Sequence, residues 1–223
     1  MKLTNLDYVK KHPQVLGAIK ESDRALGALG YTDHGLRHLN LTADRAKEIA
    51  LSVGLSDREA ELAAVAGFCH DFGNFMGRDQ HHYWSALLFH QIFQNDFPAD
   101  ELIQVVQAIA NHDNKAEMKF SNNISAVLVL ADKSDVHRSR VRHENIEIIK
   151  QDIYDRVNYA VTRSNIKVRK KSKQINLSLL IDTEFVPIME YFEIFVERMS
   201  YCRKAADYLG FRFGLFVNNF KLL

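Results

Sequence analysis

Cysteine, proline and long hydrophobic runs are all scarce in this sequence of 223 residues. Its two cysteines, Cys69 and Cys202, form no CxxC pair and no disulfide framework, which fits a reducing compartment. The longest apolar runs, such as AVLVLA at 126–131, are far too short to span a bilayer. The first residues, MKLTNLDYVKKHPQ, lack the apolar core of a signal peptide. We therefore expect a soluble cytoplasmic protein with no membrane partner.

An excess of charge of one sign is missing as well. The formal net charge is +1, so no strong overall field attracts nucleic acid, and we expect no nucleic-acid partner. Hydrophobic residues make up 47% of the chain. That fraction and this length suffice for one sizeable core, or for one core with an appendage.

Apolar residues at helical spacing dominate the first two thirds of the chain, and they predict a mainly α fold with a helical domain over residues 1–150. The expected helices cover 1–29, Asp33 (as N-cap) to Gly54, an Ala-rich segment opened by a Ser56–Glu59 capping box and ended by Gly73, 81–95, a segment starting near Pro98 and Asp100, and one capped by Asn122 or Asn123.

The pattern changes after residue 150. Alternating apolar residues predict strands around Val157–Val161, around 166–168 and over 175–181. The basic stretch 169–173 is predicted to be a hairpin tip or a loop. A long helix is expected from Thr183 or Pro187 to about Leu209, followed by a short strand. Residues 151–223 are therefore predicted to form a small α+β appendage.

Four histidines and two aspartates fall in a suggestive order on the predicted helices: His38, His70-Asp71, His81, His112 and Asp132. A single buried histidine is usually a satisfied core residue, and a buried unpaired carboxylate costs several kcal/mol. Together, however, neutral imidazoles and ionised carboxylates are the ligands of Zn, Fe, Mn, Co or Ni. Six ligands suit two divalent ions if Asp71 bridges them. Such a pair, about 3.5–4 Å apart, activates a hydroxide for attack on a phosphoester.

This ordered set resembles the HD-domain superfamily of metal-dependent phosphohydrolases over residues 30–140. AGFCHDFG at 66–73, HHYWSAL at 81–87, VQAIANH at 106–112 and LADK at 130–133 resemble the family's ligand-bearing segments. The resemblance implies that His38, His70, Asp71 and Asp132 bind a first metal. It implies that His81 and His112 add a second, and that Asp71 is catalytic. Mg is an alternative to the transition metals.

Several departures from the family's patterns narrow the subclass. The superfamily's cyclic-dinucleotide phosphodiesterases carry a lysine where this chain has Asn74, and a second histidine where it has Asp113. Their Gly-Tyr-Pro signature is absent as well. The chain also lacks the motif that follows the last aspartate in the superfamily's bacterial dinucleoside tetraphosphate hydrolases. The resemblance therefore implies a hydrolase of a small phosphorylated substrate of nucleotide type and leaves the exact substrate open.

Four further residues are candidates for the substrate site. His34, one helical turn before His38, suits a phosphate contact or a proton donor, and equally a surface position. Arg37 and Lys133 neighbour ligands and could neutralise phosphate charge, and Arg78 lies in the loop before His81; a solvated role is the alternative for each.

Three functions stay open: a phosphohydrolase, a di-iron oxygenase of the same superfamily with the same six ligands, and a non-catalytic regulatory module. The appendage is expected to cover the pocket or to form a homodimer.

Overall fold

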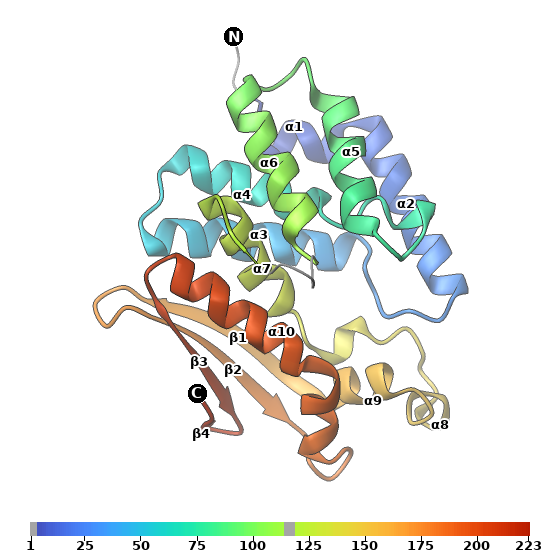
Figure 1. Ribbon diagram of the computed structural model, residues 1–223. Coiled ribbons are helices and arrows are strands. Elements are labelled where there is room, and N and C mark those ends of the chain that lie inside the picture. The colour runs from blue at the N-terminus through green and yellow to red at the C-terminus, as the bar shows by residue number, and fades with distance from the viewer. Residues whose placement is uncertain (1–3, 114–118) are drawn as a thin grey trace.

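The computed structural model describes residues 4–113 and 119–223, in which a helical part stands above a small sheet with one long helix across it (Figure 1). The helical part contains α1 (Leu6–Lys11), α2 (Pro13–Ala28), α3 (Leu36–Val53), α4 (Asp57–Cys69), η1 (Asn74–Met76), α5 (His81–Phe93), α6 (Ala99–Asn111) and α7 (Asn123–Lys133). The chain continues through η2 (Arg138–Arg140), α8 (Ile146–Ile149), α9 (Ile153–Ala160), β1 (Val161–Arg169), β2 (Gln174–Ile181), α10 (Ile188–Tyr208), β3 (Arg212–Val217) and β4 (Phe220–Lys221). The predicted helical bundle with an α+β appendage is confirmed.

Two predicted boundaries in the first fifty residues were wrong. The expected helix over 1–29 is divided at His12, because Pro13 is the first residue of α2 and holds the preceding residue extended. Asp33 does not cap α3, which begins at Leu36 after Gly35. The carboxylate of Asp33 instead accepts from the N–H of Gly35 at 2.8 Å and pairs with Arg37 at 2.7 Å.

The predicted Ser56–Glu59 capping box is present, and Gly54 ends α3 in the left-handed conformation. Close approach of α3 and α4 depends on Gly67, where an added Cβ would lie 2.9 Å from the Cα of Ala43. Since α3 carries His38 and α4 leads into His70, this small residue sets the separation of the two histidines.

The sheet has the order β1-β2-β3-β4. β1 and β2 form the predicted hairpin, with its tip at 170–173, whereas β2 and β3 are parallel and are joined through α10. The predicted strand at Val157–Tyr159 was wrong: this segment is helix α9, capped by the side chain of Asp152. Val157 and Ala160 are buried there, and their spacing of three residues places both on one face of a helix.

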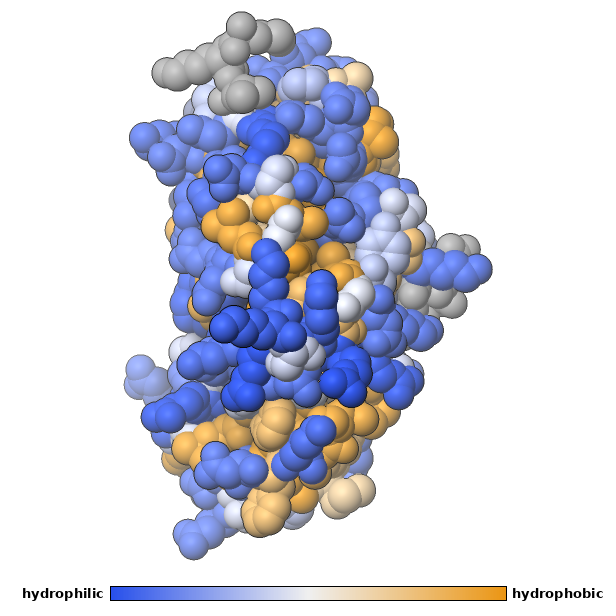
Figure 2. Space-filling model, turned by 90° about the vertical axis from the view of Figure 1, so that its left-hand side faces the viewer, coloured by the Kyte–Doolittle hydropathy of each residue, from blue (hydrophilic) through white to orange (hydrophobic). Residues whose placement is uncertain are grey.

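The long helix α10 lies across the sheet and also packs against α7 (Figure 1). Buried hydrophobic residues of the helical part and of the appendage form one continuous cluster. On the face shown in Figure 2, hydrophobic residues gather in an upper and a lower area, separated by a hydrophilic band. Among the described residues, no helix combines the length and the hydrophobicity needed to cross a membrane.

Candidate metal centre

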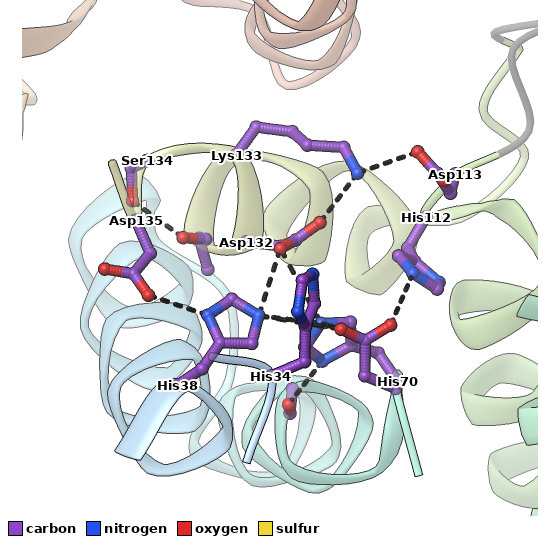
Figure 3. A network of polar contacts seen from close by, with 12 residues as sticks. His34, His38, His70, His112, Asp113, Asp132, Lys133, Ser134 and Asp135 are labelled. Carbon is purple, nitrogen blue, oxygen red and sulfur yellow. Dashed lines mark hydrogen bonds and ion pairs between the residues drawn. The ribbon is translucent and has the colours of Figure 1, made fainter. Parts of the chain in front are cut away.

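The structure brings all six predicted ligands together inside the helical part. His38 comes from α3, His70 and Asp71 follow α4, His81 begins α5, His112 follows α6, and Asp132 lies in α7. Each is at most 8% exposed. Figure 3 shows His38, His70 and His112 converging beneath Asp132. Five helices therefore contribute to one buried group of side chains.

The four histidines share one orientation: each Nδ1 is held by an oxygen atom outside the group. The partners are Asp135 Oδ2 for His38 (2.7 Å), Gly67 O for His70 (2.8 Å), Arg78 O for His81 (2.9 Å) and Ile109 O for His112 (2.7 Å). A carbonyl or carboxylate oxygen only accepts, so each Nδ1 is protonated and donates. Each Nε2 is left to face the interior of the group.

The Nε2 atoms lie close to one another in two pairs. They are 3.2 Å apart for His38 and His70, and 3.1 Å apart for His81 and His112. When both Nε2 atoms of a pair are unprotonated, as metal binding requires, their lone pairs repel each other at this distance. A divalent cation relieves that repulsion, and a second contact from the other ring nitrogen to an oxygen atom is the usual support of a metal-binding imidazole.

Asp71 lies between the two histidine pairs. Its Oδ2 is 3.4 Å from His70 Nε2 and 3.8 Å from His38 Nε2, whereas Oδ1 is 3.0 Å from His81 Nε2 and 3.6 Å from His112 Nε2. Among the residues that the structure describes, the buried Oδ1 has no hydrogen-bond partner. Burial by itself raises the pKa of Asp71, but the neighbouring His70 and the other histidines outweigh it and hold the pKa well below its usual range. The carboxylate is thus ionised and presents one oxygen to each pair.

Asp132 completes the first pair and is itself held by a lysine. Its Oδ1 lies 3.3 Å from His38 Nε2 and 3.6 Å from His70 Nε2, while Oδ2 contacts Lys133 Nζ at 2.8 Å (Figure 3). The same ammonium donates to Asp113 at 3.0 Å. Burial opposes the charge of Lys133, but Asp113 and Asp132 outweigh it and raise its pKa. Lys133 also lines a cavity that adjoins this buried group, so it both orients Asp132 and faces the cavity.

His34 is buried beside the group, so the surface alternative was wrong for this residue. Its Nδ1 donates to Thr32 O at 2.7 Å, and its ring packs edge-on against His38. Burial, followed by the charges of Arg140 and Arg78, holds the pKa of His34 well below its usual value. The ring is neutral at pH 7, and its Nε2 is an acceptor, which disfavours the expected role as a proton donor.

The two candidate arginines have different surroundings. Arg37 pairs with Asp33 at 2.7 Å and with Asp135 at 2.8 Å, and it is not among the residues that line the cavity, so the structure does not place it at a substrate. Arg78 does line the cavity, 3.7 Å from Asp71 Oδ1. Its guanidinium donates to Asn74 Oδ1 at 2.9 Å. Asn74 therefore positions Arg78. In the sequence it stood out only because it replaces the lysine of the cyclic-dinucleotide phosphodiesterases.

Asp135 was missed in the sequence, although it holds His38. It accepts from His38 Nδ1 and from Arg37, and Arg140 donates to its backbone carbonyl at 2.9 Å. These contacts hold the pKa of Asp135 well below its usual range despite burial. Its only sequence signal is a second aspartate three residues after Asp132.

The donor set fits divalent metal ions. Three overlapping groups have ligand atoms close enough to hold an ion: His38 with His70 and Asp71; His70 with His112 and Asp132; and Asp71 with His81 and His112. All donors are imidazole nitrogens or carboxylate oxygens, which suit Mn, Fe, Co, Ni and Zn. The buried group could therefore hold metal ions.

Comparison with known proteins agrees with this chemistry. A family model described as HD domain matches residues 35–159, which include all six candidate ligands. No curated protein matches the chain.

Proposed function

Since the chain belongs to the HD domain family, we propose that it is a metal-dependent phosphohydrolase of a small phosphoester of nucleotide type, acting with two divalent ions. The observation that carries this proposal is the position of Asp71, with one oxygen toward His38 and His70 and the other toward His81 and His112. Asp132 would serve with the first pair. Asp71 would be shared by both ions.

Two bound divalent ions supply Lewis acidity at the phosphoryl oxygens and lower the pKa of water. The chain's own residues supply binding and hydrogen-bond acceptance. Arg78 and Lys133 line the cavity beside the ligands, where their charges would neutralise a phosphoryl group. Neutral His34 lines the same space and is suited to accept a hydrogen bond through Nε2. This cationic lining favours a phosphoester over a neutral polyol as substrate.

The first test combines metal content with a substrate panel. Protein stripped by a chelator is reloaded with Mn, Co, Ni, Fe or Mg and incubated with mono-, di- and cyclic nucleotides and with sugar phosphates. We expect metal-dependent phosphate release and two equivalents of bound metal. Oxygen consumption by the iron-loaded protein without phosphate release would instead support the di-iron oxygenase.

Asp71→Asn and His70→Ala test the candidate ligands in the same two assays, metal content and phosphate release. Both are expected to lose turnover and to lose the second metal equivalent, because each removes a ligand that a shared site requires. Asp100→Asn, an exposed change on α6, is the control. Full activity of Asp71→Asn would favour the non-catalytic module.

A further inference from the structure

A cavity of about 550 Å³ opens from the metal centre and has walls from both parts of the chain. The helical part contributes Tyr31, His34, Arg78 and Lys133, among others. The appendage contributes Asp152 and Tyr154 from the start of α9, and Ile194, Glu197, Arg198 and Tyr201 from α10. The four residues from α10 lie beyond residue 159, outside the family match. One wall of the candidate active site is therefore built by the appendage.

Arg198 is the residue of α10 that reaches deepest. It lines both the cavity and a smaller recess that is also lined by the ligands Asp71, His81, His112 and Asp132. Its guanidinium packs over the ring of Phe195, 4.8 Å from the centroid. Within residues 4–113 and 119–223 its guanidinium makes no hydrogen bond or ion pair.

Other cations meet Arg198 at this recess. Arg78, Lys133 and Arg140 line it as well. Lys133 and Arg140 are each less than a tenth exposed, and the buried Nε of Arg140 has no hydrogen-bond partner in the described part of the chain. Asp71, Asp113 and Asp132 line the recess too and offset three of its four cations, so Arg198 remains as the cation without an ion pair among the described residues. An unpaired charge beside other cations favours an anionic ligand. The recess is therefore suited to a multiply charged anion that is close to the metal ligands.

The outer cavity shares Arg78, Lys133 and Arg198 with the recess but adds acidic groups. Asp79, Asp152 and Glu197 line it but do not line the recess, and Tyr31 and Tyr154 lie there too. Carboxylates and phenols accept hydrogen bonds from hydroxyl or amino groups, and they repel further phosphate groups. A ligand that matches this distribution has one anionic end and one end rich in hydrogen-bond donors.

We propose that the cavity binds a phosphate monoester, with the phosphoryl group between the metal centre and Arg198 and the organic part against the outer wall that carries Asp152 and Glu197. This inference rests on the proposed function and names its substrate class. A chain of two or three phosphates would extend from the cationic recess toward three carboxylates. Nucleoside monophosphates fit the distribution, and nucleoside di- and triphosphates do not.

The test of Arg198 uses inorganic phosphate as the probe, measured by calorimetric titration of the full chain loaded with metal. We expect Arg198→Gln to raise the Kd for phosphate at least about tenfold, the loss of one charge-assisted contact. Bound metal should be unchanged. Arg203→Gln, an exposed change on the same helix that does not line the cavity, should bind phosphate like the parent chain. Arg198→Lys, which keeps the charge, should fall between the two.

Equal phosphate affinity in Arg198→Gln, Arg198→Lys and the parent chain would overturn the proposal. The assignment of Arg198 and that of hydrolysis are separable. If phosphate binding weakens in Arg198→Gln but no phosphoester is cleaved, the anion site is supported and the proposed function fails. If esters are cleaved with the same KM by Arg198→Gln, the proposed function is supported and this assignment fails.

The substrate class is tested with a nucleoside 5′-monophosphate and the corresponding 5′-diphosphate. We expect kcat/KM to favour the monophosphate at least about tenfold in the parent chain. Glu197→Gln should narrow that ratio by admitting the diphosphate. A parent chain that prefers the diphosphate would refute the monoester assignment.

Discussion

Single side chains that are not candidate ligands help to set the orientation of the histidine rings. Asp135 is the clearest case, because it is the only acidic side chain that holds a ligand histidine by its Nδ1 within the described part of the chain. The other three Nδ1 atoms donate to backbone carbonyls. The His38 end of the site therefore depends on a residue that can be substituted, whereas the other histidine orientations depend on the fold itself.

Asp135→Asn is expected to weaken metal binding about 10–100-fold at the ion held by His38, since loss of such an outer partner has this effect in other metal sites. The ion held by His81 and His112 should be bound as before. Metal titration by calorimetry would resolve the two steps. Asp33→Asn is the control, because Asp33 also pairs with Arg37 but holds no ligand histidine. Equal weakening of both ions would contradict two separable positions.

Protonation of His70 gives a second test at the scale of the residue. Burial lowers its pKa, but Asp71 and Asp132 outweigh burial and raise the pKa to about 10 in the chain without metal. A folded-state pKa above the unfolded value of about 6.5 stabilises the fold fully below pH 6.5. That contribution is lost as the pH rises toward 10.

Since Nδ1 of His70 is held by Gly67, metal must replace the proton on Nε2. We therefore expect metal binding at pH 8 to release about one proton from His70. Calorimetry in two buffers of different ionisation enthalpy measures the release. Exposed His90 provides the control variant, His90→Gln, which should release the same number. Binding without proton release at pH 8 would disprove the raised pKa.

At the scale of the element, the spacing of α3 and α4 is set by Gly67. Gly67→Ala places a methyl group 2.9 Å from the Cα of Ala43, and backbone atoms cannot move aside cheaply. We expect a loss of about 1–3 kcal/mol in the free energy of unfolding, together with weaker metal binding, because His38 and His70 move apart.

Gly17→Ala is the matched control. Gly17 lies in the exposed part of α2 with no atom near an added Cβ. There the same substitution should stabilise the protein by roughly 0.5–1 kcal/mol through helix propensity. Urea unfolding and metal titration of both variants check the pair. Unchanged stability in Gly67→Ala would show that the helices can separate without cost.

For the whole molecule, the important question is whether the appendage unfolds with the helical part. One continuous hydrophobic cluster contains residues of both, and α10 packs on α7, the helix of Asp132. Tyr201 of α10 also donates its hydroxyl hydrogen to the carbonyl of Asn111, next to His112. The predicted division at residue 150 therefore separates two parts with a shared core.

We expect one cooperative urea transition. Trp84, the only tryptophan, reports on α5 by fluorescence, and hydrogen exchange of peptides from β2 reports on the sheet. Coincident midpoints are the expected result. Tyr201→Phe should lower the free energy of unfolding reported by both probes by about 0.5–1.5 kcal/mol. Separate midpoints would show that the appendage is an independent unit.

Much of the helical part could be predicted from local chemistry. Capping residues such as Ser56, apolar spacing and the order of histidines and aspartates are properties of short segments, so they indicated the helices and the six candidate ligands. The segment of Val157 and Tyr159 was misread because three alternating residues fit a strand and a helix equally. Asp33 was wrongly predicted to cap a helix, because its carboxylate instead accepts hydrogen bonds from Gly35 and Arg37.

Only the tertiary structure decided what surrounds the ligands. Asp135 is 97 residues from His38 in the chain, and no spacing rule joins them. Three features depend on tertiary packing. They are the lack of a partner for Arg198 among the described residues, the grouping of Lys133 with Arg140, and the carboxylates of the outer wall. Sequence determined which side chains can bind metal, because ligand chemistry belongs to the residue. Packing determined which charges remain for a substrate, because pairing depends on neighbours brought together from distant segments.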